Sequence, residues 1–148
     1  MTDFDPQDPD YETRVRASFK RQRVMETIGA ELMKIAPGEV EIALPFRADL
    51  TQQNGYLHAG IVAAIVDSAC GYAAMSLTPA GGEVLSIEFK LNLLSPAAGE
   101  SFVARGRVKR AGRNVTVCTG DLFALYGDGA EKLVATMLAT MMNVRERA

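Results

Sequence analysis

The feature that most constrains the fold is an apolar run from Gly60 to Leu77, in which Asp67 is the only charged residue. A helix that is apolar on every side is stable only when other elements cover most of its surface. A central Asp costs about 2.5–3.5 kcal/mol in a bilayer, so we predict a buried helix rather than a membrane span. This helix is expected to begin near His58 and to end before Thr78.

Alternating segments on both sides of this run can supply the covering layer. In residues 85–93, apolar side chains at odd positions alternate with polar ones at even positions, which is the period of a strand. The other strand-like segments are residues 30–35, 39–46, 101–110, 114–126 and 132–144. We predict an α+β fold in which long antiparallel strands, in meander order after the apolar helix, wrap around it.

The N-terminal part has a different character. Residues 11–28 mix basic and apolar positions as a surface amphipathic helix does, and Gly29 is suited to end that helix. Residues 1–10 are acidic, carry two prolines and are expected to form a short flexible arm. The 148 residues are about one domain's worth and contain no internal repeat, so we predict a single domain over residues 1–148.

Composition excludes several kinds of site. A net charge of −2 excludes a strongly basic nucleic-acid footprint. The chain has one histidine, His58, and two cysteines, Cys70 and Cys118, too few for a His-rich zinc site or a multi-cysteine cluster. The first ten residues lack the positively charged region and the apolar stretch of a secretory signal. We therefore expect a cytoplasmic protein with no metal site and no nucleic-acid or membrane partner.

The polar segment before the apolar helix is the best candidate for chemistry. A helix that opens with small residues leaves backbone N–H groups free, and the helix dipole adds positive charge there. The amides of Ala59 and Gly60 are thus candidates to stabilise an oxyanion. Asp67 lies further along in apolar surroundings, where a carboxylate is costly unless it is paired or used. We interpret it as a general base or a nucleophile, with a structural acid as the alternative.

Several motifs are found together in this chain. They are the amide-rich loop of Gln52, Gln53 and Asn54, then Gly55, the His58-Ala59-Gly60 turn, Asp67, the Ser86-Ile87-Glu88 strand and the Ser95-Pro96 bend. With them the sequence resembles, from about Gly38 to Val144, the hotdog-fold acyl-CoA thioesterases of the PaaI type. The resemblance implies a hotdog fold with an extra N-terminal helix, and hydrolysis of acyl-CoA to free acid and CoA without any cofactor.

The resemblance also implies roles for individual residues. Asp67 would assist the attack of water, Gln52 or Asn54 would orient the water or hold the thioester carbonyl, and Ser86 would position the water. The family usually has His-Gly-Gly where this chain has His58-Ala59-Gly60, and alanine retains the N–H that an oxyanion site needs. Two simpler interpretations stay open, in which His58 only caps the helix and Ser86 is an ordinary strand serine.

Substrate contacts are expected in two places. The loop and helix would contribute Gly55, Tyr56 and Tyr72 to the substrate site. A basic cluster around the Ala111-Gly112 turn includes Arg110 and Arg113, whose guanidinium groups suit the phosphates of CoA. The alternative interpretation of this cluster is a solvated hairpin tip.

The resemblance further implies edge-to-edge pairing of subunits, as a homodimer or as a dimer of dimers (a homotetramer). The active site would then lie at the subunit interface, where the loop of one chain meets the Asp67 helix or the Ser86 strand of the other. Two other functions remain open: a non-catalytic acyl-CoA-binding or sensing domain, and an enoyl-thioester hydratase or dehydratase that uses His58 and Asp67. The sequence does not identify the acyl group.

Overall fold

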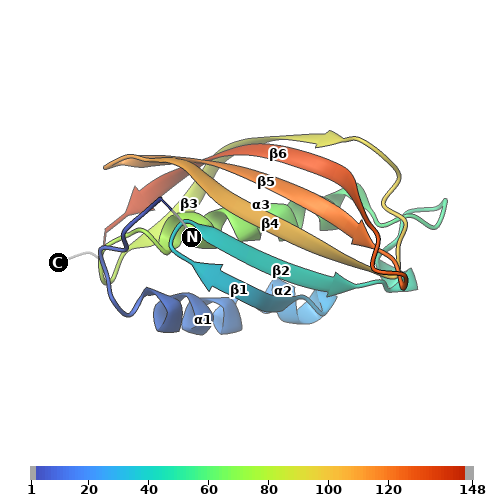
Figure 1. Cartoon of the computed structure of the whole chain (residues 1–148), viewed down its shortest axis with the longest axis horizontal. Helices are drawn as coiled ribbons and strands as arrows, with labels where there is room; N and C mark the ends of the chain where they lie inside the picture. Colours follow the sequence, from blue (N-terminus) through green and yellow to red (C-terminus); the bar gives the residue numbers. More distant parts are fainter. Residues whose placement is uncertain (1–2, 146–148) are drawn as a thin grey trace.

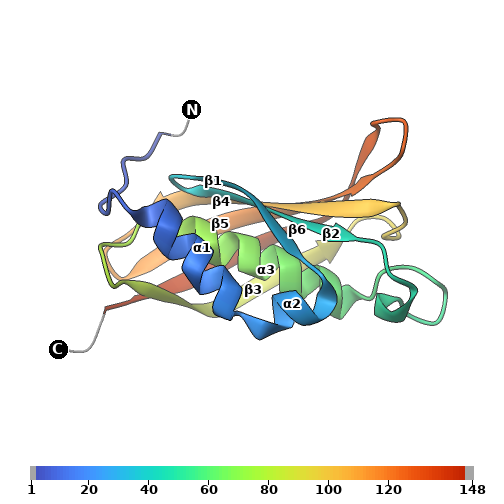
Figure 2. The same cartoon turned by 90° about the horizontal axis from the view of Figure 1, so that it is seen from below.

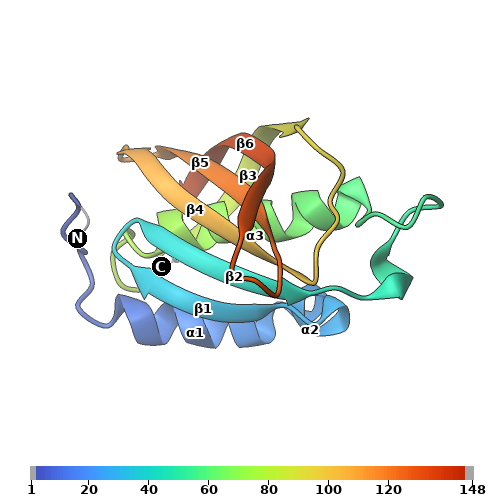
Figure 3. The ribbon, with the colours of Figure 1, turned by 45° about the vertical axis from the view of Figure 1, so that its right-hand side comes forward.

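The computed structural model describes residues 3–145, which form one curved antiparallel sheet and three helices. The elements in chain order are α1 (Tyr11–Arg21), α2 (Arg23–Ile28), β1 (Glu31–Ala36), β2 (Glu39–Pro45), the 3-10 helix η1 (Ala48–Leu50), α3 (Ala59–Met75), β3 (Glu83–Leu93), β4 (Ser101–Ala111), β5 (Val115–Leu125) and β6 (Glu131–Val144). The sheet lies over α3 and curves around it (Figures 1 and 3). This confirms the predicted fold class, a sheet wrapped around one central helix.

The strand order departs from the predicted meander at one strand. The sheet runs β1-β2-β4-β5-β6-β3, so β3 pairs with β6 at the far edge instead of with β4. Residues 94–100, which contain Pro96, join β3 to β4, and the N–H groups of Leu94 and Ser95 both donate to the carbonyl of Val134 in β6. This connection is too long for a tight hairpin, and its hydrogen bonds hold it against β6.

The helix α3 packs directly on the backbone of the sheet. Gly106 in β4 and Gly120 in β5 are register partners, and both lie under the helix. A Cβ atom built on Gly106 would lie 2.3 Å from the carbonyl carbon of Ala69, and one on Gly120 would lie 2.6 Å from Val66 Cγ1. Glycine at both positions lets the helix approach closely. Among residues 3–145, no helix has both the length and the apolar character that a bilayer crossing requires.

The predicted N-terminal helix over residues 11–28 is broken into α1 and α2. Gln22 separates them in an extended backbone conformation, while its side chain turns toward α3. The amide Nε2 of Gln22 donates to Ser68 Oγ at 2.9 Å, and Oε1 accepts from the Tyr72 hydroxyl at 3.2 Å. Figure 2 shows the two helices beside α3. As predicted, α2 stops at Gly29, which has a left-handed φ of +79°.

Arg14 of α1 ties the N-terminal segment to the end of α3. Its guanidinium donates to Asp8 Oδ2 at 2.8 Å, to the Thr78 carbonyl at 2.9 Å and to the Gly82 carbonyl at 2.8 Å. Gln7 Nε2 also donates to the carbonyl of Leu77 at 2.8 Å. The segment expected to be a flexible arm is thus anchored from Gln7 onward, and residues 1–2 lie outside the described residues.

We predict that Arg14→Met lowers the free energy of unfolding by about 3 kcal/mol, because two carbonyl groups lose hydrogen bonds from a charged donor. A drop in Tm of roughly 10 °C follows for a chain of this size. The matched control is Arg16→Met on the same helix, since the exposed ion pair of Arg16 with Glu12 contributes little. Thermal unfolding followed by circular dichroism measures both variants, and equal Tm values would contradict the anchoring role of Arg14.

Candidate active site

A bulge in β3 turns Ser86 toward α3. The register between β3 and β6 shifts between Ser86 and Glu88, so Ile87 is an extra residue in the strand. Strict alternation would place Ser86 on the same face as Glu88; instead the Ser86 hydroxyl donates to Asp67 Oδ1 at 2.7 Å. Bulges of this kind re-aim side chains and are common beside active sites. The bulge therefore brings together two residues that the sequence analysis singled out separately.

The carboxyl group of Asp67 lies in a partly buried position on α3. Burial raises the pKa of Asp67, and the hydrogen bond from Ser86 acts in the opposite direction by stabilising the charged form. A carboxylate with a raised pKa is a better general base than an exposed one at neutral pH. The position thus has the electrostatic character that a water-activating base requires.

The amides at the start of α3 are not equally available. His58 is the N-cap residue, and its Nδ1 accepts a hydrogen bond from the Gly60 N–H at 2.8 Å. The N–H groups of Ile61 and Val62 both donate to the His58 carbonyl. In the part of the chain that the structure describes, only the Ala59 N–H among these four has no acceptor. His58 therefore caps the helix, and of the two predicted oxyanion donors Ala59 alone is free.

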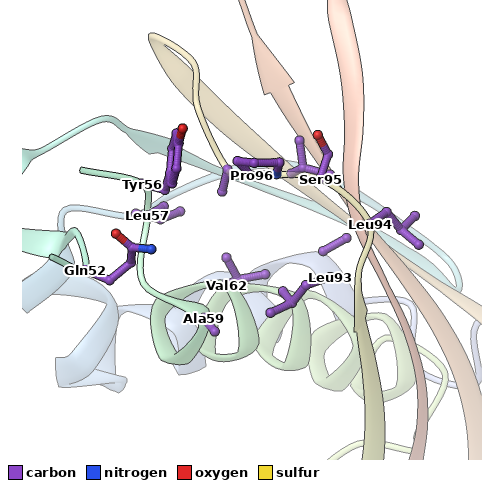
Figure 4. A pocket seen from close by; sticks show the side chains of 12 residues that line it. Gln52, Tyr56, Leu57, Ala59, Val62, Leu93, Leu94, Ser95 and Pro96 are labelled. Atoms are coloured by element: carbon purple, nitrogen blue, oxygen red, sulfur yellow. The ribbon is translucent and has the colours of Figure 1, made fainter. Parts of the chain in front are cut away.

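The loop before α3 places an amide side chain beside this free N–H. The loop is closed by a bridge between Thr51 and Leu57 and turns at Gly55, which has a φ of +85°. Gln52 Oε1 accepts from the backbone N–H of Asn54, and this fixes which end of the amide faces the loop. The Gln52 nitrogen consequently points toward the cavity in front of α3 (Figure 4).

This cavity has a volume of about 390 Å³ and mostly apolar walls. It is lined by Gln52, Tyr56, Leu57, Ala59, Val62, Leu93, Leu94, Ser95, Pro96, Ala97, Val134 and Ala135. Figure 4 shows the Tyr56 and Pro96 rings above Ala59 and Val62. No sequence pattern indicated that Leu93 and Leu94 line this cavity, although they directly precede the Ser95-Pro96 bend, which is one of the motifs named above. The cavity can receive an apolar group next to the two N–H donors of Gln52 and Ala59.

Within one copy of the chain these donors and Asp67 are well separated. Asp67 comes eight residues after Ala59 on α3, which corresponds to about 12 Å along the helix axis. Groups that act on one reacting carbonyl must all lie within hydrogen-bond distance of its atoms or of the attacking water. In one copy of the chain, the predicted oxyanion donors and the predicted base thus lie at two different places.

The other predicted site residues are more scattered. Asn54 and Gly55 are exposed at the tip of the loop, whereas Tyr72 is buried beside the break between α1 and α2. Arg110 and Arg113 lie at the β4–β5 turn, and Arg113 lines a hollow of about 320 Å³ with Thr78 and Gly82. That hollow is also lined by Ala74 and Leu77, so it lies at the opposite end of α3 from Ala59. Gln22, which contacts Ser68 and Tyr72, was missed, and no sequence motif marks it.

Possible metal ligands do not gather in the described residues. Between positions 3 and 145, no three His, Cys, Asp or Glu side chains are arranged to hold a metal ion. The thiols of Cys70 and Cys118 are buried, and burial raises the pKa of both, that of Cys118 to about 12. These cysteines accordingly behave as small core residues, as the sequence analysis interpreted them.

Comparison with known proteins places the chain in a family. Residues 54–129 match the family model described as Thioesterase superfamily, which is about half of the chain. The chain belongs to the thioesterase superfamily. A crystal structure of a thioesterase family protein from Silicibacter pomeroyi is 49% identical, with a TM-score of 0.89, and the match covers 92% of this chain and 99% of that one.

Two further relatives of this thioesterase superfamily member agree with that placement. The PaaI protein of the E. coli phenylacetic acid degradation operon has the same fold, with a TM-score of 0.81 at 16% identity over 93% of this chain and 96% of that one. Human acyl-coenzyme A thioesterase 13 is 27% identical over 73% of this chain and 78% of its own length. The resemblance stated from the sequence is thereby confirmed at the level of the hotdog thioesterase family.

Proposed function

We propose that this chain hydrolyses acyl-CoA thioesters to a free acid and CoA. The observation that carries the proposal is the hydrogen bond from Ser86 to Asp67, which holds a partly buried carboxylate on the central helix of a thioesterase fold. The name of human acyl-coenzyme A thioesterase 13 supports CoA esters as the substrate class. Arg110 and Arg113 remain our candidates for contact with the CoA phosphates, which the pantetheine arm separates from the thioester.

In the proposed mechanism Asp67 takes a proton from water as the water oxygen attacks the thioester carbon. Ser86 positions this water together with the carboxylate. The carbonyl oxygen becomes an oxyanion, which accepts hydrogen bonds from the Ala59 N–H and from Gln52 Nε2. The carbon–sulfur bond then breaks and the thiolate leaves. Since a thiolate is a good leaving group, no strong general acid is needed, and every step uses groups of the chain, water and substrate alone.

We further propose that two copies share each site by pairing along β3. This strand is the edge of the sheet and exposes Leu85, Ile87, Phe89 and Leu93 at 64, 51, 43 and 55% of their surfaces. A long apolar edge strand is a template for pairing with another strand. A two-fold axis at this edge would set the two α3 helices side by side and antiparallel, which brings Ala59 of one chain toward Asp67 of the other.

Mixed dimers test the shared site. Ala59→Pro removes the free N–H at the first helical position, where proline is well tolerated, and we expect about a 10²–10³-fold loss of kcat. If Asp67→Asn and Ala59→Pro chains are refolded together, each mixed dimer contains one intact site and one doubly altered site. Since half of the dimers are mixed, about one quarter of wild-type activity should return. Activity no higher than that of the parent variants would show that the two groups act within one chain.

Ser86→Ala is expected to move the acidic limb of the pH profile of kcat/KM toward higher pH. The lost hydrogen bond stabilises the carboxylate, so its removal raises the pKa of Asp67 further, and the base form appears only at higher pH. A strand serine outside the site, Ser101, provides the control variant Ser101→Ala. An unchanged acidic limb in Ser86→Ala, with only a lower plateau, would contradict an electrostatic role for this hydroxyl.

The function itself is tested by release of free thiol from a panel of short, medium, long and aromatic acyl-CoAs. We expect turnover of at least one class, slowed about 10²–10⁴-fold in Asp67→Asn. A tight acyl-CoA complex without thiol release over hours would favour the acyl-CoA-binding domain instead. A change in enoyl absorbance with a crotonyl-type or a 3-hydroxyacyl thioester, without thiol release, would favour the hydratase or dehydratase.

A further inference from the structure

A further cavity lies between α3, β3 and the break that separates α1 from α2, and Asp67 forms part of its wall. It has a volume of about 150 Å³. Most of its wall residues have polar side chains, in contrast to the apolar cavity near Ala59. Those that matter here are Gln22, Asp67, Ser68, Tyr72, Glu83 and Ser86. Because Asp67 and Ser86 belong to this wall, any group that extends from the thioester past them meets polar side chains.

The polar side chains of this cavity form a chain of hydrogen bonds centred on Gln22. Its amide bridges Ser68 and Tyr72, which are four residues apart and lie on the same face of α3. The Ser18 hydroxyl donates to the Tyr72 oxygen at 3.5 Å, and the Tyr72 ring packs against Phe19 with ring centres 5.8 Å apart. These contacts hold Gln22 in a fixed position at the break between α1 and α2.

Two hydrogen-bond donors of this network are not used. Gln22 Nε2 carries two N–H groups and donates one of them, to Ser68 Oγ. Ser68 accepts that bond, and its own hydroxyl proton has no acceptor within the residues that the structure describes. Unused donors beside a cavity suit a ligand oxygen. The carboxylates of Asp67 and Glu83 on the same wall oppose an anion and can accept a hydrogen bond from a neutral hydroxyl.

We propose that Gln22 selects acyl groups that carry a hydroxyl, which it binds in this cavity together with Ser68. This inference rests on the proposed thioesterase activity and specifies its substrate class. Gln22 bridges Ser68 and Tyr72, which lie about 1.5 and 7.5 Å beyond Asp67 along α3, so the hydroxyl belongs on roughly the third to fifth carbon of the acyl chain. The volume of about 150 Å³ accepts a group of about six heavy atoms.

The experiment compares hexanoyl-CoA with 3-hydroxyhexanoyl-CoA and 5-hydroxyhexanoyl-CoA, which have the same chain length. We expect kcat/KM of the unchanged protein to be at least about tenfold higher for one of the hydroxylated substrates. In Gln22→Met, which keeps the length of the side chain, this ratio should fall to about one. Tyr72→Phe keeps the packed ring and should lower the ratio partly, because Tyr72 positions the Gln22 amide.

Gln7→Met is the matched control. Gln7 also donates a hydrogen bond from the N-terminal segment, to the carbonyl of Leu77 just after α3, but it lines a different hollow. This variant should leave the ratio unchanged. A ratio near one in the unchanged protein, a ratio that persists in Gln22→Met, or an equal loss for all three substrates would overturn the role of Gln22 in selectivity. Absence of thiol release from all three substrates, with turnover of other acyl-CoAs, would overturn only this inference; absence with every acyl-CoA would overturn the proposed function as well.

Discussion

An Asp67→Asn variant is expected to release thiol from acyl-CoA about 10²–10⁴-fold more slowly than the unchanged chain, because the amide cannot take a proton from the attacking water. The substitution keeps the size of the side chain and still accepts the hydrogen bond from Ser86. The loss should therefore appear in kcat, with little change in KM. Steady-state kinetics with a thiol reagent measure both constants.

The same variant should not lose stability at neutral pH. Burial raises the pKa of Asp67 in the folded chain above its unfolded value. The contribution of such a group is fully present below the unfolded pKa and is lost as the pH rises through the folded pKa. Asn does not titrate, so the Tm of Asp67→Asn relative to the unchanged chain should increase from acidic to neutral pH. An inactive variant with a much lower Tm at neutral pH would attribute the loss to misfolding instead of chemistry.

The largest expected effect on stability comes from Gly106→Ala. The new Cβ would lie 2.3 Å from the carbonyl carbon of Ala69 and 2.4 Å from its oxygen, and a helix backbone cannot move aside as a flexible side chain can. Overpacking costs about 1–3 kcal/mol in a core that can relax, so we expect about 3 kcal/mol or more here. Thermal and urea unfolding should both report the loss.

Gly71→Ala on α3 provides the matched control for adding one methyl group. The nearest atom to its new Cβ is Val84 Cγ2 at 3.9 Å, an ordinary contact. Because alanine favours a helix interior over glycine by about 1 kcal/mol, this variant should be more stable than the unchanged chain. Similar unfolding free energies for Gly106→Ala and Gly71→Ala would show that the helix does not rest on the sheet backbone at Gly106.

The main elements could be predicted because their patterns are long and local. The apolar run gave α3 within a residue or two of its ends, and period-two alternation located the strands. The place of β3 in the sheet could not be read in this way, because it depends on how residues 94–100 bind to Val134 in β6. Pairing between distant strands is a tertiary property, and no local pattern in these residues records it.

The site was predictable in part for the same reason. Asp67 was found as the only charged residue of an apolar run and Ser86 through the family resemblance, but their contact depends on a bulge at Ile87 that alternation does not reveal. The availability of the Ala59 and Gly60 amides also differs because His58 turns its ring back to bind one of them. Gln22 escaped notice because a glutamine in a charged helix is ordinary until its partners on α3 are known.

The bulge at Ile87 also limits which insertions and deletions β3 can accept. Before the bulge, Ser86 faces the helix; after it, Leu91 does, although the two are an odd number of residues apart. The strand thus has an N-terminal half in which Ser86 contacts Asp67 and a C-terminal half in which Leu91 packs against the core. Deleting the single residue Ile87 would reverse the facing of one half relative to the other. Insertions and deletions in this strand should therefore be tolerated less well than substitutions at positions other than Ser86.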